Sequence, residues 1–212
     1  MIIVIGNQKG GAGTSTLALL LANYLAVERR RKVTVLDMAH HKAIRSKAEK
    51  AKILENEPLY EVLAVDACDC GNLMNNSISK DERIVLVDFP KRMDHNELVP
   101  VLSNAQAFLC PFSYDEATVD CTVLFALIVR KINLRAPLLF VPNRIKTSAR
   151  YELKNDVDKS LRRLGAVVPA IPDRIDIHRV NTLGTPEDIR QLLNPIFDLV
   201  YEQYVDGRSA TM

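Results

Sequence analysis

Short apolar runs recur along the chain, and longer stretches with helical periodicity separate them. Most runs are continuous rather than alternating, which is typical of strands buried on both faces of a parallel sheet. The pattern predicts strands at residues 2–5, 33–36, 60–65, 84–87, 107–110, 138–141 and 167–171, and helices at residues 15–28, 42–54, 116–132, 150–164 and 187–204. We therefore expect an α/β fold: a doubly wound, mostly parallel sheet with helices on both faces and ligands at the carboxyl ends of the strands.

The bulk properties allow one substantial core. The chain has 212 residues, of which 48% are hydrophobic, so we expect one domain over residues 1–205 and a frayed tail over residues 206–212. The net charge of +2 neither indicates nor excludes nucleic-acid binding. No apolar run approaches the roughly 18 residues that span a bilayer, and the N-terminus lacks the features of a signal peptide. These features predict a cytoplasmic protein.

The four cysteines do not form an evident scaffold or metal site. Cys68, Cys70, Cys110 and Cys121 are few and scattered, and no second Cys or His pair complements the closely spaced Cys68 and Cys70. We interpret all four as reduced structural thiols.

The segment with the clearest chemistry follows the first strand. Residues 6–16 read Gly-Asn-Gln-Lys-Gly-Gly-Ala-Gly-Thr-Ser-Thr and lead into an apolar helix, the context that a phosphate-binding loop requires. Gly10, Gly11 and Gly13 allow close approach of the backbone to an anion, and the helix N-terminus supplies partial positive charge. Ser15 occupies the position from which a hydroxyl binds Mg²⁺. The alternative is an ordinary glycine-rich turn.

This loop resembles the deviant Walker A motif, Lys-Gly-Gly-x-Gly-Lys-[Ser/Thr]-Thr, of the ParA/MinD family of P-loop ATPases. It matches that motif except at Thr14, where the family has a lysine, and the resemblance extends over nearly the whole chain. It implies a P-loop NTPase fold that binds ATP or ADP with Mg²⁺. The implied phosphate-binding residues are Gly10, Gly11, Ala12, Gly13, Thr14, Ser15 and Thr16.

Lys9 corresponds to the signature lysine of the family. In the family this lysine reaches across a nucleotide-sandwich dimer to the phosphates of the partner's nucleotide. The resemblance therefore assigns Lys9 a catalytic role and implies a nucleotide-dependent homodimer. The alternative is a solvated loop lysine.

Asp37 ends the second predicted strand and matches the first aspartate of the family's Asp-x-Asp motif, which makes it a catalytic candidate. Ala39 replaces the second aspartate, which is associated with positioning the attacking water. His40 or His41 could replace it as a base. Because the usual Pro-Gln pair is also absent, we interpret both as surface histidines.

Asp88 ends the apolar strand at residues 84–87, as in a Walker B element, where such an aspartate helps to hold Mg²⁺. A helix-capping or turn aspartate is the alternative. Two further strand ends match the family's adenine-binding positions by order and context, namely Asn143 and the pair Pro172 and Asp173. These segments could equally be simple loops.

The departures from the family motif predict weak binding and very slow hydrolysis. Thr14 cannot replace the charge of a lysine, and losing one charge-assisted hydrogen bond costs on the order of 1.5 to 3 kcal/mol, or roughly 10-fold to 150-fold in affinity. Ala39 removes the group that positions water. Because residues 39–41 differ together, we favour natural divergence over an engineered change at Thr14.

Three basic clusters are candidate DNA surfaces, although each could be only a solvated helix face. They lie at residues 29–32, on the predicted helix at residues 42–54, and in a C-terminal group. We favour the third, because relatives often place their DNA contacts in this half. Its candidates are Lys146, Arg150, Lys159, Arg162 and Arg163. The acidic, amphipathic segment at residues 196–204 disfavours membrane targeting of the MinD type.

Two functions follow from these observations. The first is a ParA-like partition or positioning ATPase that acts with DNA and a ParB-like or cargo-adaptor protein. The second is a catalytically inactive pseudo-ATPase that retains the fold and acts as a regulatory or scaffold dimer. We see no distinct substrate site for a P-loop metabolic enzyme.

Overall fold

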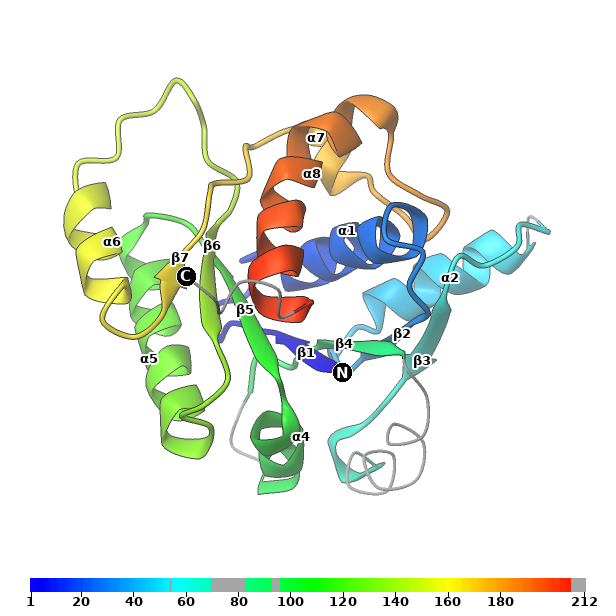
Figure 1. Cartoon of the computed structure of the whole chain (residues 1–212), viewed down its shortest axis with the longest axis horizontal. Coiled ribbons are helices and arrows are strands. Elements are labelled where there is room, and N and C mark those ends of the chain that lie inside the picture. Colours follow the sequence, from blue (N-terminus) through cyan, green and yellow to red (C-terminus); the bar gives the residue numbers. More distant parts are fainter. Residues whose placement is uncertain (54, 70–82, 93–95, 207–212) are drawn as a thin grey trace.

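A parallel β-sheet forms the centre of the molecule (Figure 1). The structure is a computed structural model that describes residues 1–53, 55–69, 83–92 and 96–206. Within these residues, seven strands pair in the order β3-β2-β4-β1-β5-β6-β7, each parallel to its neighbours. They are β1 (Ile2–Ile5), β2 (Val33–Asp37), β3 (Glu61–Ala64), β4 (Ile84–Asp88), β5 (Ala107–Phe112), β6 (Leu138–Pro142) and β7 (Ala166–Val167). The predicted doubly wound α/β fold is confirmed.

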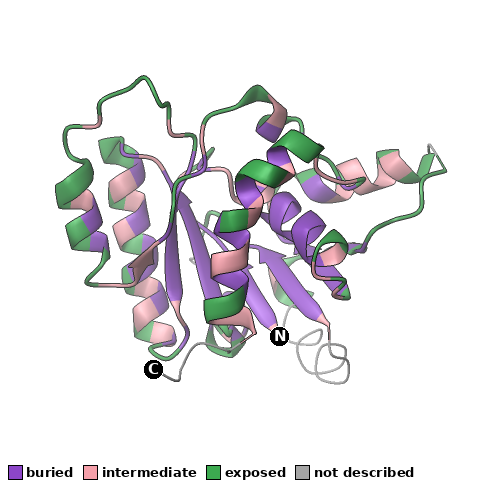
Figure 2. Ribbon diagram, turned by 45° about the horizontal axis from the view of Figure 1, so that its top comes forward, coloured by how far each residue is buried: buried purple, intermediate pink, exposed green. Residues whose placement is uncertain are grey.

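Helices cover both faces of the sheet, which accounts for the continuous apolar strands. The α-helices are α1 (Thr14–Val27), α2 (Ala43–Ile53), α4 (Val99–Asn104), α5 (Glu116–Ile132), α6 (Lys154–Leu161), α7 (Ile175–His178) and α8 (Glu187–Val200). Short 3₁₀ turns occur at η1 (Ala67–Asp69) and η2 (Asn96–Leu98), and a π-helical turn, η3 (Tyr201–Val205), follows α8. All residues of β1, β2, β4, β5 and β6 are buried, and the strands are correspondingly purple in Figure 2.

Two hydrophobic cores form because successive strand side chains point to opposite faces. Ile3 and Ile5 belong to the core that includes Leu20 and other side chains of α1 and α8. Ile2 and Val4 belong to the opposite core, which includes Phe125 of α5. The sheet is thus held between two layers of helices.

The strand order places the loop after β1 at the point where the chain reverses direction across the sheet. Strands β2, β3 and β4 lie on one side of β1, and strands β5, β6 and β7 lie on the other. In such sheets, ligands bind outside the carboxyl ends of the strands at this reversal. Ile5 pairs with Asp88, so the loop begins directly beside the end of β4.

Two elements predicted between residues 150 and 171 had the wrong bounds. The helix expected from residue 150 begins at Lys154, and its C-cap is Arg162. The strand expected over residues 167–171 is reduced to the two residues of β7. Pro169 and Pro172 lack the backbone donors that a regular ladder needs, although Ile171 N–H still donates to Pro142 O at 2.8 Å.

Helix α4 was missed by the sequence analysis. Its Pro100 lies in the first turn, where the absent N–H leaves no helical bond unmade. The helix predicted to end at residue 204 ends at Val200 and passes into η3. Leu54, at the predicted end of α2, and the predicted tail beyond Asp206 lie outside the described residues.

Among the described residues, no helix combines the length and apolar character needed to cross a bilayer. Three cysteines have free thiols in the described part of the chain, with Cys68 exposed, Cys110 buried and Cys121 partly buried. Cys70 lies outside it.

Candidate nucleotide-binding site

The loop between β1 and α1 has the backbone of an anion cradle. Gly11 and Gly13 adopt positive φ values of 83° and 98°. Gly13 caps α1, and its carbonyl accepts the N–H of Leu17 at 2.8 Å. The first turn of α1 contains no acidic residue. Its free N–H groups therefore face the loop without an acidic side chain of the same helix turn to occupy them.

A buried asparagine that the sequence analysis missed fixes the start of the loop. Asn7 is 1% exposed, and its side-chain amide donates to Pro111 O at 2.9 Å and to Thr122 Oγ1 at 2.8 Å. Its Oδ1 accepts the N–H of Lys9 at 2.8 Å. The available signal was an asparagine two residues after a buried strand, where a backbone-binding side chain is favoured.

Asn143 supports the other end of the loop. It is 5% exposed, and its Nδ2 donates to Ala12 O at 2.9 Å. A Cβ atom on Gly13 would lie 2.2 Å from the same Nδ2, so glycine is required there for space as well as for conformation. The structure thus brings Asn143 to the loop, as expected of a residue at the nucleotide site. Its role in adenine recognition stays a prediction.

Pro172 and Asp173 lie beside the segment that follows Asn143. Pro172 forms a parallel bridge with Ile145, and Asp173 N–H donates to Ile145 O at 3.1 Å. The Asp173 carboxylate and the His178 ring are 2.9 Å apart, and this hydrogen bond holds the pKa of Asp173 below its usual value. The two segments predicted to contact adenine therefore adjoin one another.

Asp88 and Ser15 form the part of the site that is suited to a cation. Ser15 Oγ donates to Asp88 Oδ2 at 2.5 Å, whereas the buried Oδ1 has no hydrogen-bond partner among the described residues. Burial raises the pKa of Asp88 to about 7, and the negative charge of Asp37 acts in the same direction. An unpartnered carboxylate oxygen beside a hydroxyl is chemically suited to Mg²⁺. The donors present therefore fit the metal that the family implies.

Asp37 lies next to Asp88 in the sheet, but backbone donors occupy its oxygens. The two residues are register partners, and Asp37 is fully buried. Its Oδ1 accepts the N–H of Ala39 at 3.2 Å and its Oδ2 that of Arg45 at 2.9 Å. In this structure Asp37 therefore supports the start of α2. Its catalytic role stays a prediction.

His40 and His41 are exposed, and their rings meet edge to face with centroids 4.8 Å apart. This matches their interpretation as surface histidines.

Three further predicted residues, Lys9, Thr14 and Thr16, are partly buried around the loop. A second lysine that the sequence analysis did not consider also reaches the loop, since a Cβ atom on Gly10 would lie 3.0 Å from Lys91 Nζ.

The three basic clusters differ in how many of their side chains form hydrogen bonds with other residues of the chain. In the first, Arg29 bonds Tyr24 and Asp198, and Arg31 donates to Tyr201. In the second, Lys42 and Arg45 donate to backbone carbonyls at the sheet edge, and Lys47 donates to Val180 O.

The third cluster differs from both, because its five candidate residues, Lys146, Arg150, Lys159, Arg162 and Arg163, are all exposed. The first two lie on the loop after β6, and the others lie on α6 and at its end. Lys159 lies in the last turn of α6, Arg162 is its C-cap, and Arg163 follows directly.

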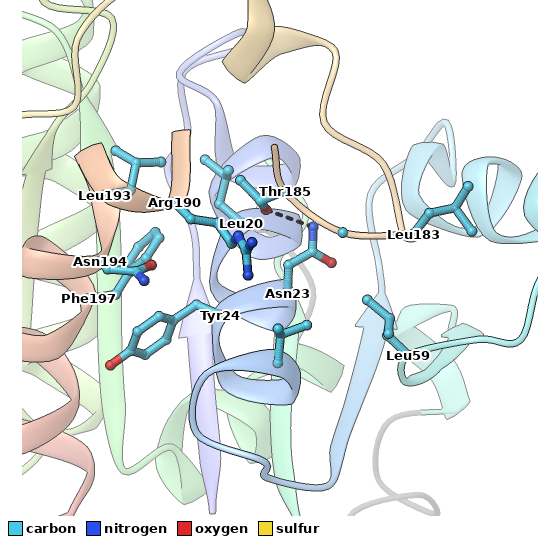
Figure 3. A pocket seen from close by; sticks show the side chains of 12 residues that line it. Leu20, Asn23, Tyr24, Leu59, Leu183, Thr185, Arg190, Leu193, Asn194 and Phe197 are labelled. Carbon is cyan, nitrogen blue, oxygen red and sulfur yellow. Dashed lines mark hydrogen bonds between the residues drawn. The ribbon is translucent and has the colours of Figure 1, made fainter. Parts of the chain in front are cut away.

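A pocket of about 220 Å³ lies away from the phosphate loop, between α1 and α8. Figure 3 shows it lined by Leu20, Tyr24, Leu193 and Phe197, with the Asn23 amide at its edge. That amide is already used: it donates to Asn181 O and Thr185 Oγ1, and it accepts from Tyr60. The pocket is a gap in helix packing, and we retain the loop as the candidate site.

The model of the CobQ/CobB/MinD/ParA nucleotide binding domain matches residues 3–186. The chain belongs to this family. No curated protein sequence matched it.

Solved structures confirm that the family fold is present. A Borrelia burgdorferi B31 protein assigned to plasmid partition, bound to AMPPNP, has a TM-score of 0.75 and 21% identity, with 95% of this chain and 98% of that chain covered. A complex of a Cyanothece McdA variant with ATP has a TM-score of 0.69 and 14% identity, with 95% of each chain covered. MinD of Aquifex aeolicus, a cell division protein, has a TM-score of 0.68 and 16% identity, with 100% and 98% covered. This P-loop α/β fold agrees with the resemblance found in the sequence.

Proposed function

We propose that this protein is a ParA-like nucleotide-binding switch of the DNA partition or positioning type, which binds Mg²⁺-ATP or Mg²⁺-ADP weakly. The observation that supports it best is the buried Asp88 carboxylate beside Ser15, at the mouth of a loop whose glycines are in anion-binding conformations. A buried oxygen without a partner is costly unless a ligand completes it. Mg²⁺ held by Ser15 and Asp88 would offset phosphate charge there.

Hydrolysis is expected to be poor or absent. Ala39 offers no group to orient water, and both oxygens of Asp37 accept backbone N–H groups. Thr14 adds no positive charge near the phosphates. Nucleotide recognition can persist without turnover, because backbone N–H groups and the helix terminus bind phosphate independently of these side chains.

Lys9 is proposed to act across a nucleotide-dependent homodimer, on the partner's phosphates. The exposed residues Lys146, Arg150, Lys159, Arg162 and Arg163 are the proposed contacts with non-specific DNA. A ParB-like or cargo-adaptor protein would be the partner, as suggested by a fold neighbour that was solved as a complex of MinC with MinD from Aquifex aeolicus.

A pseudo-ATPase that acts as a regulatory or scaffold dimer is the second candidate. It is favoured by the coincidence of Thr14 and Ala39, each of which removes a group used in turnover. The two candidates share nucleotide binding and differ in whether slow hydrolysis remains to drive a cycle.

The deciding experiment is Mg²⁺-ATP calorimetry together with steady-state hydrolysis in the same buffer, for the parent and Thr14→Lys. We expect weak binding with poor or no turnover in the parent, and binding about 10-fold or more tighter in the variant. Measurable turnover in the parent would favour the ATPase cycle over the pseudo-ATPase. Absence of binding to both proteins would refute a nucleotide switch.

The proposed role of Lys9 has a separate test by sedimentation. Lys9→Ala should reduce ATP-dependent dimerisation, while Lys50→Ala, which removes an exposed charge from α2, should not. A Lys9→Ala variant that dimerises as well as the parent would remove the role in trans.

A further inference from the structure

The end of the Lys91 side chain lies against Gly10 of the phosphate loop. Lys91 follows β4 by three residues, and β4 pairs with β1, so their carboxyl ends lie at the same edge of the sheet. From a Cβ atom placed on Gly10, Nζ, Cε and Cδ of Lys91 would be 3.0, 3.5 and 3.8 Å away. The last part of the side chain is therefore packed against the loop, with the ammonium group nearest to it.

The ammonium group of Lys91 is available to an anion. The residue is exposed, and its amine makes no hydrogen bond or ion pair with any other described residue. The positive charge also acts on the neighbouring Asp88, where it opposes the rise in pKa caused by burial. Lys91 thus contributes to the electrostatic field of the site, and no described residue forms an ion pair with it.

The loop itself lacks one expected cation. Thr14 stands at the first residue of α1, where the family motif has a lysine that reaches the phosphates of its own chain's nucleotide. The threonine hydroxyl is partly buried and lies close enough to the Asp88 carboxyl to lower the pKa of that group. Among the described residues, Lys91 is positioned to return a positive charge to this loop from another element.

We propose that Lys91 binds the phosphates of the nucleotide held by its own chain and so replaces, from the end of β4, the lysine that is missing at Thr14. This inference rests on the proposed nucleotide binding and adds a specific residue to it. An ammonium on a flexible stem acts as a point charge, so its point of attachment matters less than where its nitrogen can be placed. A solvated lysine without a phosphate partner is the competing account.

The test is Mg²⁺-ATP calorimetry on the full chain with matched lysine variants. Lys91→Ala should weaken binding by about 10-fold or more, the effect of losing one charge-assisted hydrogen bond, and Lys91→Arg should restore most of the affinity. Lys50→Ala is the control, because it removes the same charge from an exposed position on α2. Thermal unfolding of each variant establishes that all are folded.

The same substitution in a Thr14→Lys background tests replacement directly. Once a lysine is present at position 14, Lys91→Ala should have a much smaller effect on affinity than in the parent. Equal losses in both backgrounds would show that Lys91 does not replace the missing lysine. A parent that binds ATP, combined with a Lys91→Ala variant that binds equally well, would overturn this inference and leave the proposed function intact. A parent that binds no ATP would overturn both.

Discussion

At position 13, both the backbone conformation and the neighbouring atoms exclude any residue except glycine. Its φ is 98°, and a Cβ atom would meet Asn143 Nδ2 at 2.2 Å. We predict that Gly13→Ala lowers the free energy of unfolding by about 2 kcal/mol or more. Gly11→Ala is the control: its φ is also positive, but nothing lies within 4 Å of the added atom, so only the backbone cost of about 1 kcal/mol applies. Equal losses in urea unfolding would mean that the contact with Asn143 is unimportant.

The buried Asp88 carboxyl should make the free energy of unfolding of the metal-free protein depend on pH. Because burial raises its folded pKa to about 7, the folded state binds more protons than the unfolded state between about pH 4 and pH 7. Stability from this group therefore falls as the pH rises through that window and remains low above it. Asp88→Asn should remove this decline and be more stable than the parent at pH 8, by roughly 2 to 4 kcal/mol.

The control for this pH dependence is Asp37→Asn. The Asp37 carboxylate accepts two backbone N–H groups, so its neutralisation should destabilise the protein at pH 8. Urea unfolding in EDTA from pH 5 to pH 8 measures both variants. An Asp88→Asn profile that follows the parent would contradict a buried, costly carboxylate.

At the scale of elements, the phosphate loop depends on contacts between β1, β5 and α5. Asn7 links them through Pro111 O and Thr122 Oγ1. We predict that Asn7→Ala costs about 2 to 3 kcal/mol of stability, because buried polar groups lose their partners. It should also weaken Mg²⁺-ATP binding, because the loop loses its support on α5.

Asn104→Ala is the matched control for Asn7. Asn104 is exposed and donates to Pro100 O on its own helix, so its loss should cost less than about 0.5 kcal/mol. Urea unfolding and ATP calorimetry measure the pair. If both variants behave like the parent, Asn7 does not support the loop.

At the scale of the whole molecule, the carboxyl ends of β1, β4 and β6 lie at one edge of the sheet. The exposed basic residues lie beyond the end of β6, from the loop that follows it to the end of α6. Arg162 and Arg163 are exposed there. We predict that replacing both with alanine weakens binding to non-specific duplex DNA and reduces the slope of log affinity against log salt by about 2.

The control variant replaces Lys50 and Lys52 with alanine, which removes the same net charge from α2. Its salt slope, measured by fluorescence anisotropy of a labelled duplex at several salt concentrations, should stay close to that of the parent. Identical slopes for the two double variants would place the DNA surface elsewhere on the molecule.

The sequence by itself determined the layered architecture and the position of the loop. Continuous apolar runs require burial on both faces, and a glycine-rich segment between a strand and a helix predicts phosphate binding, so these features follow from local pattern. The local pattern was a poorer guide to the ends of helices and to short helices. Helix α6 is shorter than its helical pattern, and α4, which has a proline in its first turn, was missed.

Only the tertiary structure decided which distant side chains complete the loop. Asn7 reaches α5, Asn143 reaches Ala12 across 131 positions of sequence, and Lys91 arrives from the end of β4. The tertiary structure also distinguished the two buried aspartates: backbone donors bind both oxygens of Asp37, whereas one oxygen of Asp88 has no hydrogen-bond partner in the described part of the chain. The physical reason is that parallel strands gather their carboxyl ends at one edge of the sheet, so the contacts there depend on strand order and not on proximity along the chain.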